Sequence, residues 1–515
     1  MQQKSATAEA VGNGEGRSFA AHALRYEDSR HEDSARTFLA VLALVAAARF
    51  AALALNGTDL YMDEAQYWAW SRELAPGYFS KPPLVAWIIR GATALCGDGE
   101  ACVRLPATLI HLLTACLVYL LAHRLYSARV AFWSGLAYAL LPAVSLSSGI
   151  ISTDVPLLAA WALALFAFAG LIERPNVRDT LLLAVALGIG LNAKYAMAYF
   201  IPCAAVFFAV TPAARARLAS PHLWIALAGG LFLIAPNLLW NQANNFATFA
   251  HTAENANWRG IPFHPDKAAE FLLAQFGVFG PILFGGLLVI VWRSLRGVSD
   301  VPQTDRLLLA FSAPVLAAVT IQALLSRAHA NWAAPAYIAA VVLVTAVMIR
   351  DRDWRWMRAS FAIHALVAIL IAGATWQAGR FVLPVVGDPF ARTLGNREMA
   401  AAVRDELADA ERRGAPIRAI LTDDREIAAA LAYYGQNLPV PQLAWRKGAT
   451  PRSHFEMTHP LTAASPTPLL LVTPRAPSDL TADFGSATGP RIREIRAGMA
   501  TRTLAFVTLS GFKEK

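Results

Sequence analysis

The sequence predicts a mainly α-helical protein, a polytopic membrane bundle that ends in a small α/β domain. Hydrophobic residues make up 56% of the 515-residue chain and charged residues only 16%, against about 25% charged residues in soluble proteins. The apolar residues gather in runs close to the roughly 20 residues that a helix needs to cross a bilayer. After residue 380 these runs shorten, and proline, glycine and charge become more frequent.

We expect eleven membrane crossings. They lie at about residues 37–55, 104–123, 130–149, 155–172, 180–193, 196–211, 222–240, 270–292, 307–325, 333–349 and 359–379. Residues 1–36 are polar and of mixed charge, and they lack the basic, apolar and cleavage regions of a signal peptide. This segment is expected to be a disordered cytoplasmic tail.

Basic residues alternate between the connections and predict the orientation of the bundle. Every second connection contains arginines and none of the candidate site residues, so we expect these connections in the cytoplasm. Their arginines are Arg124, Arg129, Arg174, Arg178, Arg215, Arg217, Arg293, Arg296, Arg350, Arg352, Arg355 and Arg358. With an odd number of crossings, everything after Arg380 lies on the opposite side. In a multi-pass protein of the cell inner membrane, that side is the periplasm.

The membrane domain is predicted to span residues 37–380, and a soluble periplasmic α/β domain residues 395–515. The later segment has helical patterns at 397–414 and 425–435 and strand-like runs at 417–424, 469–474 and 502–509. About 120 residues suffice for an independent core. No motif in this domain indicates a reaction, so it is expected to be a lid or an acceptor platform.

Two of the four cysteines are candidates for a disulfide. Cys96 and Cys102 flank the turn-forming GDGE in an external connection, where an oxidising compartment favours pairing. Two unrelated thiols are the alternative. Cys116 and Cys203 lie within apolar segments and are expected to be buried as small hydrophobic residues.

The first external connection contains adjacent acids, Asp63 and Glu64, followed by aromatic residues that include Tyr67. One carboxylate near a membrane could simply cap a helix, but this grouping indicates a site. We interpret Asp63 as a general base that takes a proton from an attacking hydroxyl. Glu64 is a second catalytic candidate that orients a neighbour or binds a cation.

Three further charged residues stand among apolar external segments. Asp154 begins a membrane helix, so it is either an N-cap or a second acid that positions the acceptor or a cation. Lys194 interrupts an apolar run and needs an anion. That anion is either a protein carboxylate or a substrate phosphate. Lys81, before Pro82 and Pro83, is a phosphate-binding candidate or an interfacial lysine whose ammonium reaches water.

Other external residues extend the candidate site. His329 and Arg327, together with Tyr67, are candidates for the donor phosphate. A polar loop has a composition suited to sugars, although a hydrated loop explains it equally well. Its residues are Asn237, Trp240, Asn241, Asn244, Asn245, His251, Glu254, Asn255, Asn257 and Trp258.

Six short motifs resemble those of the bacterial GT-C glycosyltransferases, relatives of the protein O-mannosyltransferases and of the lipid A aminoarabinose transferase. They are DEAQYWAWS, GYFSKPPLVAW, RLPA, STDVPLL, NAKY and HANWAAPAY. The resemblance covers about residues 37–380 and is nearest to the rhizobial-type lipid A and core galacturonosyltransferases. It implies an inverting enzyme that moves a sugar from a polyprenyl-phosphate donor to an envelope acceptor such as lipid A, lipopolysaccharide core or another glycolipid.

The resemblance also implies roles for individual residues. Asp63 matches the catalytic base and Lys81 the lysine that contacts the donor phosphate. Asp154 matches the second acid of the site, and Lys194 falls where a basic group meets the phosphate. Two departures concern the aminoarabinose enzymes, which carry a metal-linked acid where Ser80 stands and an arginine where Gln66 stands. No cofactor is therefore certain, and a divalent metal stays open.

The alternatives are a protein O-mannosyltransferase-like enzyme, a flippase or transporter for lipid-linked glycans, and a non-catalytic glycolipid scaffold. A transporter needs charge near the membrane midplane and usually has inverted repeats, whereas these charges gather at one face. A scaffold leaves the acid–lysine grouping unexplained. The expected partners are the polyprenyl-phosphate sugar, an envelope lipid or glycan acceptor, and membrane lipids, but no nucleic acid.

Overall fold

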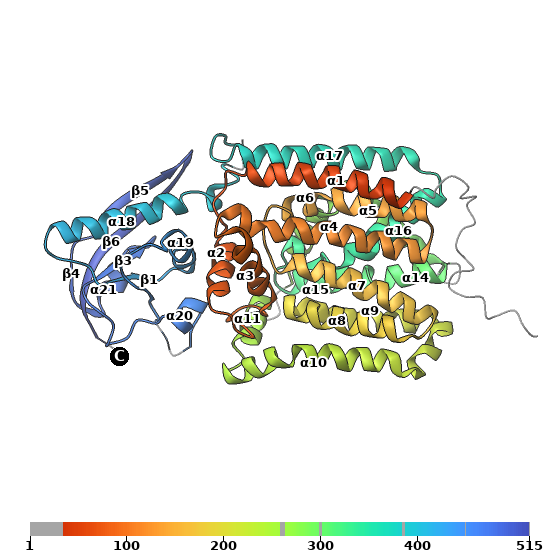
Figure 1. Cartoon of the computed structure of the whole chain (residues 1–515), viewed down its shortest axis with the longest axis horizontal. Helices are drawn as coiled ribbons and strands as arrows, with labels where there is room; N and C mark the ends of the chain where they lie inside the picture. Colours follow the sequence, from red (N-terminus) through yellow and green to blue (C-terminus); the bar gives the residue numbers. More distant parts are fainter. Residues whose placement is uncertain are drawn as a thin grey trace, which may run out of the picture.

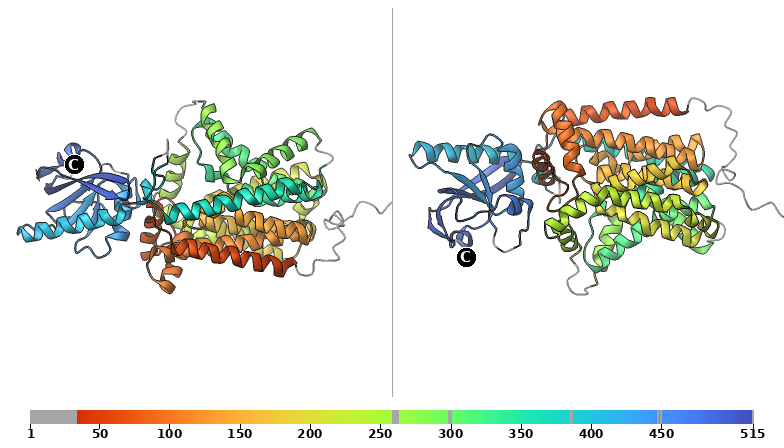
Figure 2. Two further views of the ribbon diagram at one scale, coloured as in Figure 1. Left: turned by 90° about the horizontal axis from the view of Figure 1, so that it is seen from above. Right: turned by 60° about the horizontal axis from the view of Figure 1, so that its bottom comes forward.

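The computed structural model describes residues 34–257, 263–297, 301–383, 387–446, 448 and 450–513. It contains a bundle of helices and, beyond one end of that bundle, a domain built on a β-sheet (Figure 1). Two further views show the same arrangement (Figure 2). Of the predicted N-terminal tail, residues 1–33 lie outside the described part of the chain, and the first helix begins at Ser34.

The chain enters the bundle through α1 and leaves it through α17. The first elements are α1 (Ser34–Ala54), α2 (Met62–Arg72), α3 (Leu84–Cys96), α4 (Glu100–Leu125), α5 (Ala128–Leu140), α6 (Pro142–Ser147), α7 (Asp154–Glu173), α8 (Val177–Ala193), η1 (Tyr195–Tyr199), α9 (Phe200–Val210) and η2 (Pro212–Ala219). The remaining elements are α10 (Pro221–Ala243), α11 (Ala247–Ala256), α12 (Pro265–Val278), α13 (Pro281–Arg296), α14 (Gln303–Ala310), α15 (Ala313–Leu325), η4 (Ala330–Ala333), α16 (Ala336–Arg350) and α17 (Trp354–Trp376).

Within the described residues, six helical segments are long and apolar enough to cross a membrane, or seven if the bent pair α12–α13 counts as one span. Two predicted crossings are interrupted. Segment 130–149 divides at Pro142, which begins α6 and cannot continue α5 because it lacks an amide N–H. Segment 270–292 bends by 120° between α12 and α13. Gly280 lies at this bend with φ 89°, a conformation that favours glycine.

Ion pairs join the short connections at the bundle end away from the sheet domain. Arg124 lies 3.1 Å from Asp179, and Arg350 lies 2.8 Å from Asp305. The Tyr126 hydroxyl also donates to Asp305, at 2.7 Å. In these contacts the carboxylates of Asp179 and Asp305 neutralise arginines of the predicted cytoplasmic connections.

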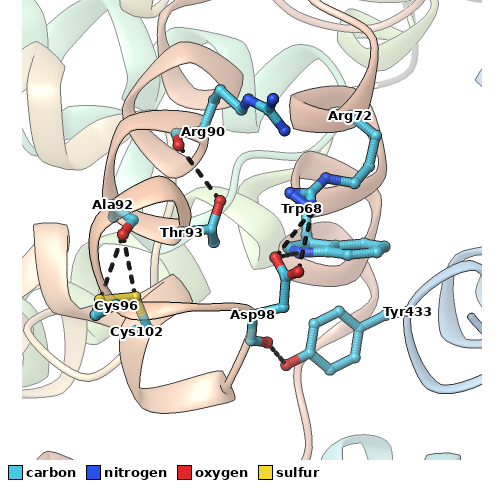
Figure 3. Close-up of a disulfide and its surroundings, with 9 residues drawn as sticks. All are labelled: Trp68, Arg72, Arg90, Ala92, Thr93, Cys96, Asp98, Cys102 and Tyr433. Atoms are coloured by element: carbon cyan, nitrogen blue, oxygen red, sulfur yellow. Dashed lines mark hydrogen bonds and ion pairs between the residues drawn. A yellow bond between two sulfur atoms is a disulfide. The ribbon is translucent and has the colours of Figure 1, made fainter.

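Helices α2 and α3 cover the other end of the bundle, next to the sheet domain (Figure 1). The predicted Cys96–Cys102 disulfide is confirmed, with 5.9 Å between the Cα atoms. It closes the turn that presents Asp98, which accepts hydrogen bonds from Trp68 and Arg72 of α2 (Figure 3). The Tyr433 hydroxyl of the sheet domain donates to the Asp98 carbonyl. The disulfide-closed turn therefore contacts both α2 and the sheet domain.

The C-terminal domain is a six-stranded mixed sheet with helices. Its elements are η5 (Ala391–Thr393), α18 (Asn396–Arg412), β1 (Ala419–Thr422), α19 (Arg425–Tyr434), β2 (Gln442–Ala444), α20 (His454–Thr458), β3 (Leu469–Thr473), α21 (Ser478–Thr481), β4 (Phe484–Ala487), β5 (Arg491–Ala497) and β6 (Ala500–Phe512). The strand order is β2-β1-β3-β6-β4, and β5 also pairs with β6. Strands β2, β1 and β3 are parallel, whereas β6 runs antiparallel to β3, β4 and β5.

Alternating side chains give this sheet a core on each face, as the two-residue period of a strand requires. In β1, Ile420 packs with α18 and α19, while Ala419 and Leu421 pack on the opposite face. A separate apolar cluster joins the C-terminal domain to the bundle. In that cluster Tyr433 of α19 and Phe455 of α20 are buried with residues of α2, α3 and α4. The two parts thus share a buried interface.

Candidate active site

The two adjacent acids at the start of α2 have different environments. The Glu64 side chain is 1% exposed and lies 2.8 Å from the Arg104 guanidinium, which is 2% exposed. Glu64 also accepts hydrogen bonds from the backbone N–H groups of Tyr61, at 2.9 Å, and Ile151, at 3.0 Å. These contacts join α2 to α4 and to the connection before α7. Glu64, a candidate for catalysis from the sequence, is therefore held in a buried ion pair.

Asp63 lies on the more open side of α2, and its side chain is 40% exposed. Its carboxylate contacts the guanidinium of Arg425, the first residue of α19. Arg425 also donates from Nε to the Gln66 side chain at 2.8 Å. The candidate base thus lies at the boundary between the bundle and the C-terminal domain. A residue of that domain touches it directly.

Lys81 is held in a compact loop between α2 and α3. The Tyr78 N–H donates to the Lys81 carbonyl at 3.1 Å, and the Tyr78 ring stacks on Trp70 with 4.7 Å between centroids. Thr248 of α11 donates to the Tyr78 carbonyl at 2.8 Å. Gly77 is needed here because a Cβ atom would lie 2.5 Å from the Trp240 ring. The loop is therefore packed against three helices: α2, α10 and α11.

The Lys81 ammonium has no carboxylate within ion-pair distance among the described residues. Burial, followed by the charge of Lys194, lowers the pKa of Lys81 to about 8, while Asp63 and Asp154 partly oppose this shift. Desolvation disfavours the charged form of a lysine unless an anion is nearby. Lys81 is consequently suited to binding an anionic ligand.

Asp154 and Lys194 form an ion pair. Lys194 Nζ lies 2.7 Å from Asp154 Oδ1, and Asn331 donates to the other carboxylate oxygen at 2.7 Å. Asp154 is the first residue of α7, and Lys194 follows the end of α8. Of the two anions considered for Lys194, the structure supplies the protein carboxylate. The pair remains partly exposed, so a substrate can still approach either group.

The other phosphate candidates lie nearby and are less enclosed. His329 and Arg327 are exposed in the connection between α15 and η4. Burial lowers the pKa of His329, as do the charges of Arg327, Lys194 and Lys81. At neutral pH His329 can therefore donate or accept a hydrogen bond without carrying a charge. Arg327 is the charged member of this pair.

Tyr67 is buried in α2 within electrostatic reach of Asp63 and Asp154. Burial raises the pKa of its hydroxyl well above the usual value, and the charges of Asp63 and Asp154 raise it further. Both carboxylates therefore act on one buried hydroxyl, which stays protonated. Lys81 is in turn influenced by Lys194, Asp63, Asp154 and Arg425. These residues share one electrostatic neighbourhood at the bundle end that faces the C-terminal domain.

A mostly apolar cavity of about 580 Å³ reaches Asp63 and Tyr67. Its walls come largely from α1, α6 and α17, with residues such as Leu53, Leu146 and Ile369. Lys81 and Lys194 are not among its lining residues. Asp63 therefore borders an apolar cavity and also shares an electrostatic neighbourhood with the lysines outside it.

The predicted polar loop is largely helical, because Asn237 and Asn241 lie within α10 and Ala247–Ala256 form α11. Its amides contribute mainly structural contacts. Asn237 is buried, accepts from the Tyr195 hydroxyl at 2.7 Å and donates to the Pro76 carbonyl at 2.8 Å. Asn241 is buried beside it and accepts from the Thr248 N–H at 3.2 Å. These two amides are used within the protein. Trp258 lies outside the described residues.

A divalent metal finds no suitable ligand set in the described parts of the chain. No group of three or more histidine, cysteine, aspartate or glutamate side chains is close enough to hold one. Asp63 and Asp154, the two partly exposed acids of the site, already face the cations Arg425 and Lys194. Ser80, the neighbour of Lys81, adds no charged ligand.

Sequence reasoning missed two contributors to the site. Arg104 lies in the RLPA motif but received no role, although a buried arginine in an apolar helix always requires a partner. Arg425 had no comparable signal. It begins an ordinary amphipathic helix after an aspartate cap in a domain without a recognisable motif.

Comparisons with known proteins place these features in a family. Residues 80–240 match the family model of the dolichyl-phosphate-mannose-protein mannosyltransferases. The chain is 36% identical over 417 residues to the lipid A galacturonosyltransferase RgtD of Rhizobium johnstonii, covering 81% of this chain and 86% of RgtD. It is 30% identical over 207 residues to an undecaprenyl phosphate–aminoarabinose transferase of Pseudomonas fluorescens, covering 38% and 35% of the two chains.

The fold has a counterpart among solved structures. ArnT from Cupriavidus metallidurans superposes with a TM-score of 0.63, covering 92% of this chain and 97% of ArnT at 15% identity. The match extends across the bundle and the C-terminal domain. The similarity to RgtD over most of both chains identifies the family. The chain therefore belongs to the GT-C family that includes the rhizobial lipid A galacturonosyltransferases, and it is a multi-pass membrane glycosyltransferase.

Proposed function

We propose that this enzyme transfers a sugar, with inversion, from a polyprenyl phosphate to a lipid acceptor of the cell envelope. The observation that carries the proposal is the place of Asp63. The ammonium of Lys81, which has no carboxylate partner among the described residues, lies in its electrostatic neighbourhood, and an apolar cavity borders Asp63. A base between an anion site and an apolar cavity suits a reaction between two lipids.

The donor phosphate binds at Lys81. This ammonium is only partly exposed to water and faces no carboxylate at ion-pair distance among the described residues, so an incoming phosphate restores its lost solvation. Lys194, His329, Arg327 and Tyr67 are the other donor-binding candidates. The names of relatives support a polyprenyl-phosphate donor. One is an undecaprenyl phosphate–aminoarabinose transferase, and ArnT has been solved with undecaprenyl phosphate.

The acceptor presents its hydroxyl from the apolar cavity. A lipid chain in this cavity places its polar end beside Asp63 and Tyr67. The lipid A galacturonosyltransferase RgtD is named for such an acceptor. Lipid A, lipopolysaccharide core and other envelope glycolipids therefore form the proposed acceptor class. The 580 Å³ volume accommodates part of an acyl chain, while the rest lies along the membrane face of α1 and α17.

Transfer then takes one displacement. The acceptor oxygen attacks the anomeric carbon from the face opposite the phosphate, and Asp63 takes the hydroxyl proton. The carbon–oxygen bond to the phosphate breaks as the new glycosidic bond forms, so the anomeric configuration inverts. The polyprenyl phosphate leaves with the bonding electron pair, and Lys81 stabilises the developing negative charge. The sugar–phosphate bond is already activated, so no nucleotide participates.

The remaining candidates support this step. Asp154 orients the acceptor or the sugar hydroxyls, and Lys194 holds its carboxylate in place through their ion pair. Tyr67 stays protonated and donates a hydrogen bond. Glu64 acts at a distance by fixing the first turn of α2 through Arg104. The role of Glu64 is thus to position Asp63.

The topology completes the proposal. Eleven crossings place the basic connections in the cytoplasm and the site and C-terminal domain in the periplasm of the cell inner membrane. The membrane domain then spans residues 37–380 and the periplasmic domain residues 395–515. The common position of α2, α3, α11 and the C-terminal domain at one end of the bundle supports this orientation (Figure 1). Opposing arginine-rich connections support it as well.

A transfer assay tests the function. Membranes with the full-length enzyme are given a polyprenyl phosphate carrying a radiolabelled sugar and an envelope lipid extract. We expect label in a glycolipid, with polyprenyl phosphate as co-product, and the corresponding mass to be absent from the envelope of a deletion strain. Movement of intact labelled donor across the membrane without a new glycosidic bond would establish a transporter instead. Label in protein would indicate an O-mannosyltransferase-like acceptor.

A further inference from the structure

Helix α17 is the least buried of the six segments long and apolar enough to cross a membrane. Only 11% of the residues in its most apolar stretch are buried, compared with 83% in α7. It lies along the outer edge of the bundle (Figure 1). A cavity of about 790 Å³ lies between α17 and α5. The proposed reaction does not use this cavity.

The cavity is basic toward one end and apolar along its walls. Arg129 is the second residue of α5, and Arg358 lies in the second turn of α17, so both are near the bundle end away from the C-terminal domain. The Arg129 guanidinium lies 4.4 Å from the centroid of the Trp354 ring, which helps to hold the cation in place. The apolar walls are formed by Trp133, Leu136, Leu140, Met357, Phe361 and Ala365.

Neither arginine of the cavity has an acidic partner. Within the described part of the chain, no carboxylate lies at ion-pair distance from Arg129 or Arg358, and this includes the exposed Asp353 at the start of α17. Other acids at this end pair with other arginines, in the pairs Asp179–Arg124, Asp305–Arg350 and Asp351–Arg293. Two cations that line one cavity are stabilised by an anion between them. Guanidinium groups match the oxygen atoms of a phosphate particularly well.

The length of the cavity indicates which kind of phosphate it accepts. Arg129 and Leu140 both line it, and a helix rises by about 16 Å between two such positions. Half of the hydrocarbon core of a bilayer is about 15 Å thick. The cavity thus extends from the level of the headgroups to about the middle of the membrane. An inorganic phosphate leaves the apolar walls without a partner, whereas a phospholipid covers them with an acyl chain.

We propose that the cavity between α5 and α17 binds an anionic phospholipid from the leaflet opposite the candidate active site. The phosphate lies between Arg129 and Arg358, and an acyl chain packs against Trp133 and Phe361. The polyprenyl-phosphate donor does not suit this position, because its phosphate has to reach Lys81 at the other end of the bundle. Lipid binding here requires no sugar transfer, so the inference stands apart from the proposed reaction.

The bound phospholipid supports a wall of the cavity beside Asp63. Leu140 and Ala365 line both cavities, so the same part of α5 and α17 borders the phospholipid and the proposed acceptor. A lipid between the two helices supplies packing that α17 lacks within the protein. A ligand that binds only the folded protein raises its unfolding temperature. An anionic phospholipid should therefore raise the Tm of the enzyme.

A lipid competition experiment tests the site in the purified full-length enzyme. The enzyme in detergent receives equal amounts of phosphatidylglycerol and phosphatidylcholine with the same acyl chains, and native mass spectrometry identifies the retained lipid. We expect wild-type enzyme to retain one phosphatidylglycerol and to have a higher Tm with this lipid than with phosphatidylcholine. In the double variant Arg129→Gln/Arg358→Gln, the affinity for phosphatidylglycerol should fall by about 10- to 100-fold, the range for lost hydrogen bonds to a charged group.

Two further variants separate this cavity from the surrounding surface. Arg296→Gln is the matched control, because Arg296 also lies over a tryptophan, 3.8 Å from the centroid of Trp292, but does not line the cavity. We expect wild-type retention of phosphatidylglycerol in this variant. Ala362→Trp places a large side chain in the cavity and keeps both arginines. We expect this variant to lose the lipid as the double variant does.

Several results would overturn the inference. One is equal retention of the two phospholipids by wild-type enzyme, and another is undiminished retention of phosphatidylglycerol in the double variant or in Ala362→Trp. Undecaprenyl phosphate and inorganic phosphate are added as competitors in separate experiments. If undecaprenyl phosphate displaces phosphatidylglycerol at lower concentration, the cavity belongs to the donor lipid. If inorganic phosphate alone raises the Tm as much as phosphatidylglycerol does, the cavity binds a free anion.

Discussion

The helical bundle and the C-terminal domain contribute to the site in opposite ways. The bundle carries the recognisable motifs and positions its acids through buried contacts, as in the Glu64–Arg104 pair. The C-terminal domain carries no motif, yet it contributes Arg425 through an exposed contact with Asp63. The buried Glu64–Arg104 pair thus orients α2. The partly exposed Arg425 contact instead determines which cation lies beside the proposed base, Asp63.

The same contrast between buried and exposed contacts distinguishes two adjacent acids of α2. Asp63 and Glu64 are neighbours in sequence, but successive positions on a helix point in different directions. Glu64 therefore faces the bundle and Asp63 faces the domain boundary. Variants at the two positions should therefore lose activity for different reasons. Asp63 variants should lose catalysis, whereas Glu64 variants should lose folding stability.

The largest effect is expected from Asp63→Asn. The amide keeps the shape of the carboxylate but cannot accept a proton, so turnover should fall by about 100- to 10,000-fold while the donor KM changes little. Single-turnover transfer in membranes measures this, with the exposed Glu73→Gln as control. More than about a tenth of wild-type activity would point to Asp154 as the base, followed by Glu64.

Glu64→Gln should instead destabilise the protein. It leaves the buried Arg104 guanidinium without its counter-charge, and breaking a buried ion pair costs about 3–5 kcal/mol. Thermal unfolding of the purified protein in detergent measures the loss. Normal thermal stability together with lost turnover would show that Glu64 acts in the reaction and would remove the contrast between the two acids.

Lys81→Ala should weaken donor binding as well as turnover. The phosphate is present in both the ground state and the transition state, so the ammonium contributes to both. We expect kcat/KM to fall by about 10- to 100-fold, with much of the change in the donor KM. Lys267→Ala removes an exposed lysine that pairs with Glu270 and serves as control. A change in kcat alone would place the phosphate elsewhere.

The donor KM should depend on pH through Lys81. Burial lowers the pKa of this ammonium to about 8, so Lys81 is charged below that pH and loses its charge above it. The donor KM should be constant at lower pH and rise about tenfold per pH unit above the pKa. Lys81→Arg keeps its charge throughout this range and should abolish the rise. A KM that falls with increasing pH contradicts this assignment.

The smallest effect on transfer is expected from the disulfide. Cys96→Ser with Cys102→Ser opens a short loop whose Asp98 still accepts hydrogen bonds from α2 (Figure 3). Turnover should stay within about twofold, because short loops gain little from a cross-link. Thiol alkylation and mass spectrometry verify the bridge in wild-type protein. A large loss of turnover would mean that the domain boundary depends on this loop.

Part of the site could be predicted from the sequence because charge is rare in this chain. Asp63, Lys81, Asp154 and Lys194 stand out against apolar surroundings, and the structure brings them into one electrostatic neighbourhood. The Lys194–Asp154 pairing could only be left as an alternative, since composition does not reveal whether a cation meets protein or substrate.

The remaining features depend on contacts between distant segments. Arg425 reaches Gln66 across 359 positions of sequence, and its local sequence is that of any exposed helix start. The break at Gly280 was hidden for a different reason. Hydropathy runs continuously through 270–292, whereas the bend depends on one backbone conformation. Among the strands, β1, β3 and β6 follow apolar runs, but the exposed β5 is formed by pairing with β6.

A structure of the full-length enzyme with a polyprenyl-phosphate sugar bound tests the central claim most directly. We expect the phosphate within about 3 Å of Lys81 Nζ, the distance of a charge-assisted hydrogen bond. The sugar should lie between that phosphate and Asp63, with the apolar cavity free for the acceptor. A phosphate bound away from Lys81, or a polyprenyl chain filling the cavity beside Asp63, would contradict this account.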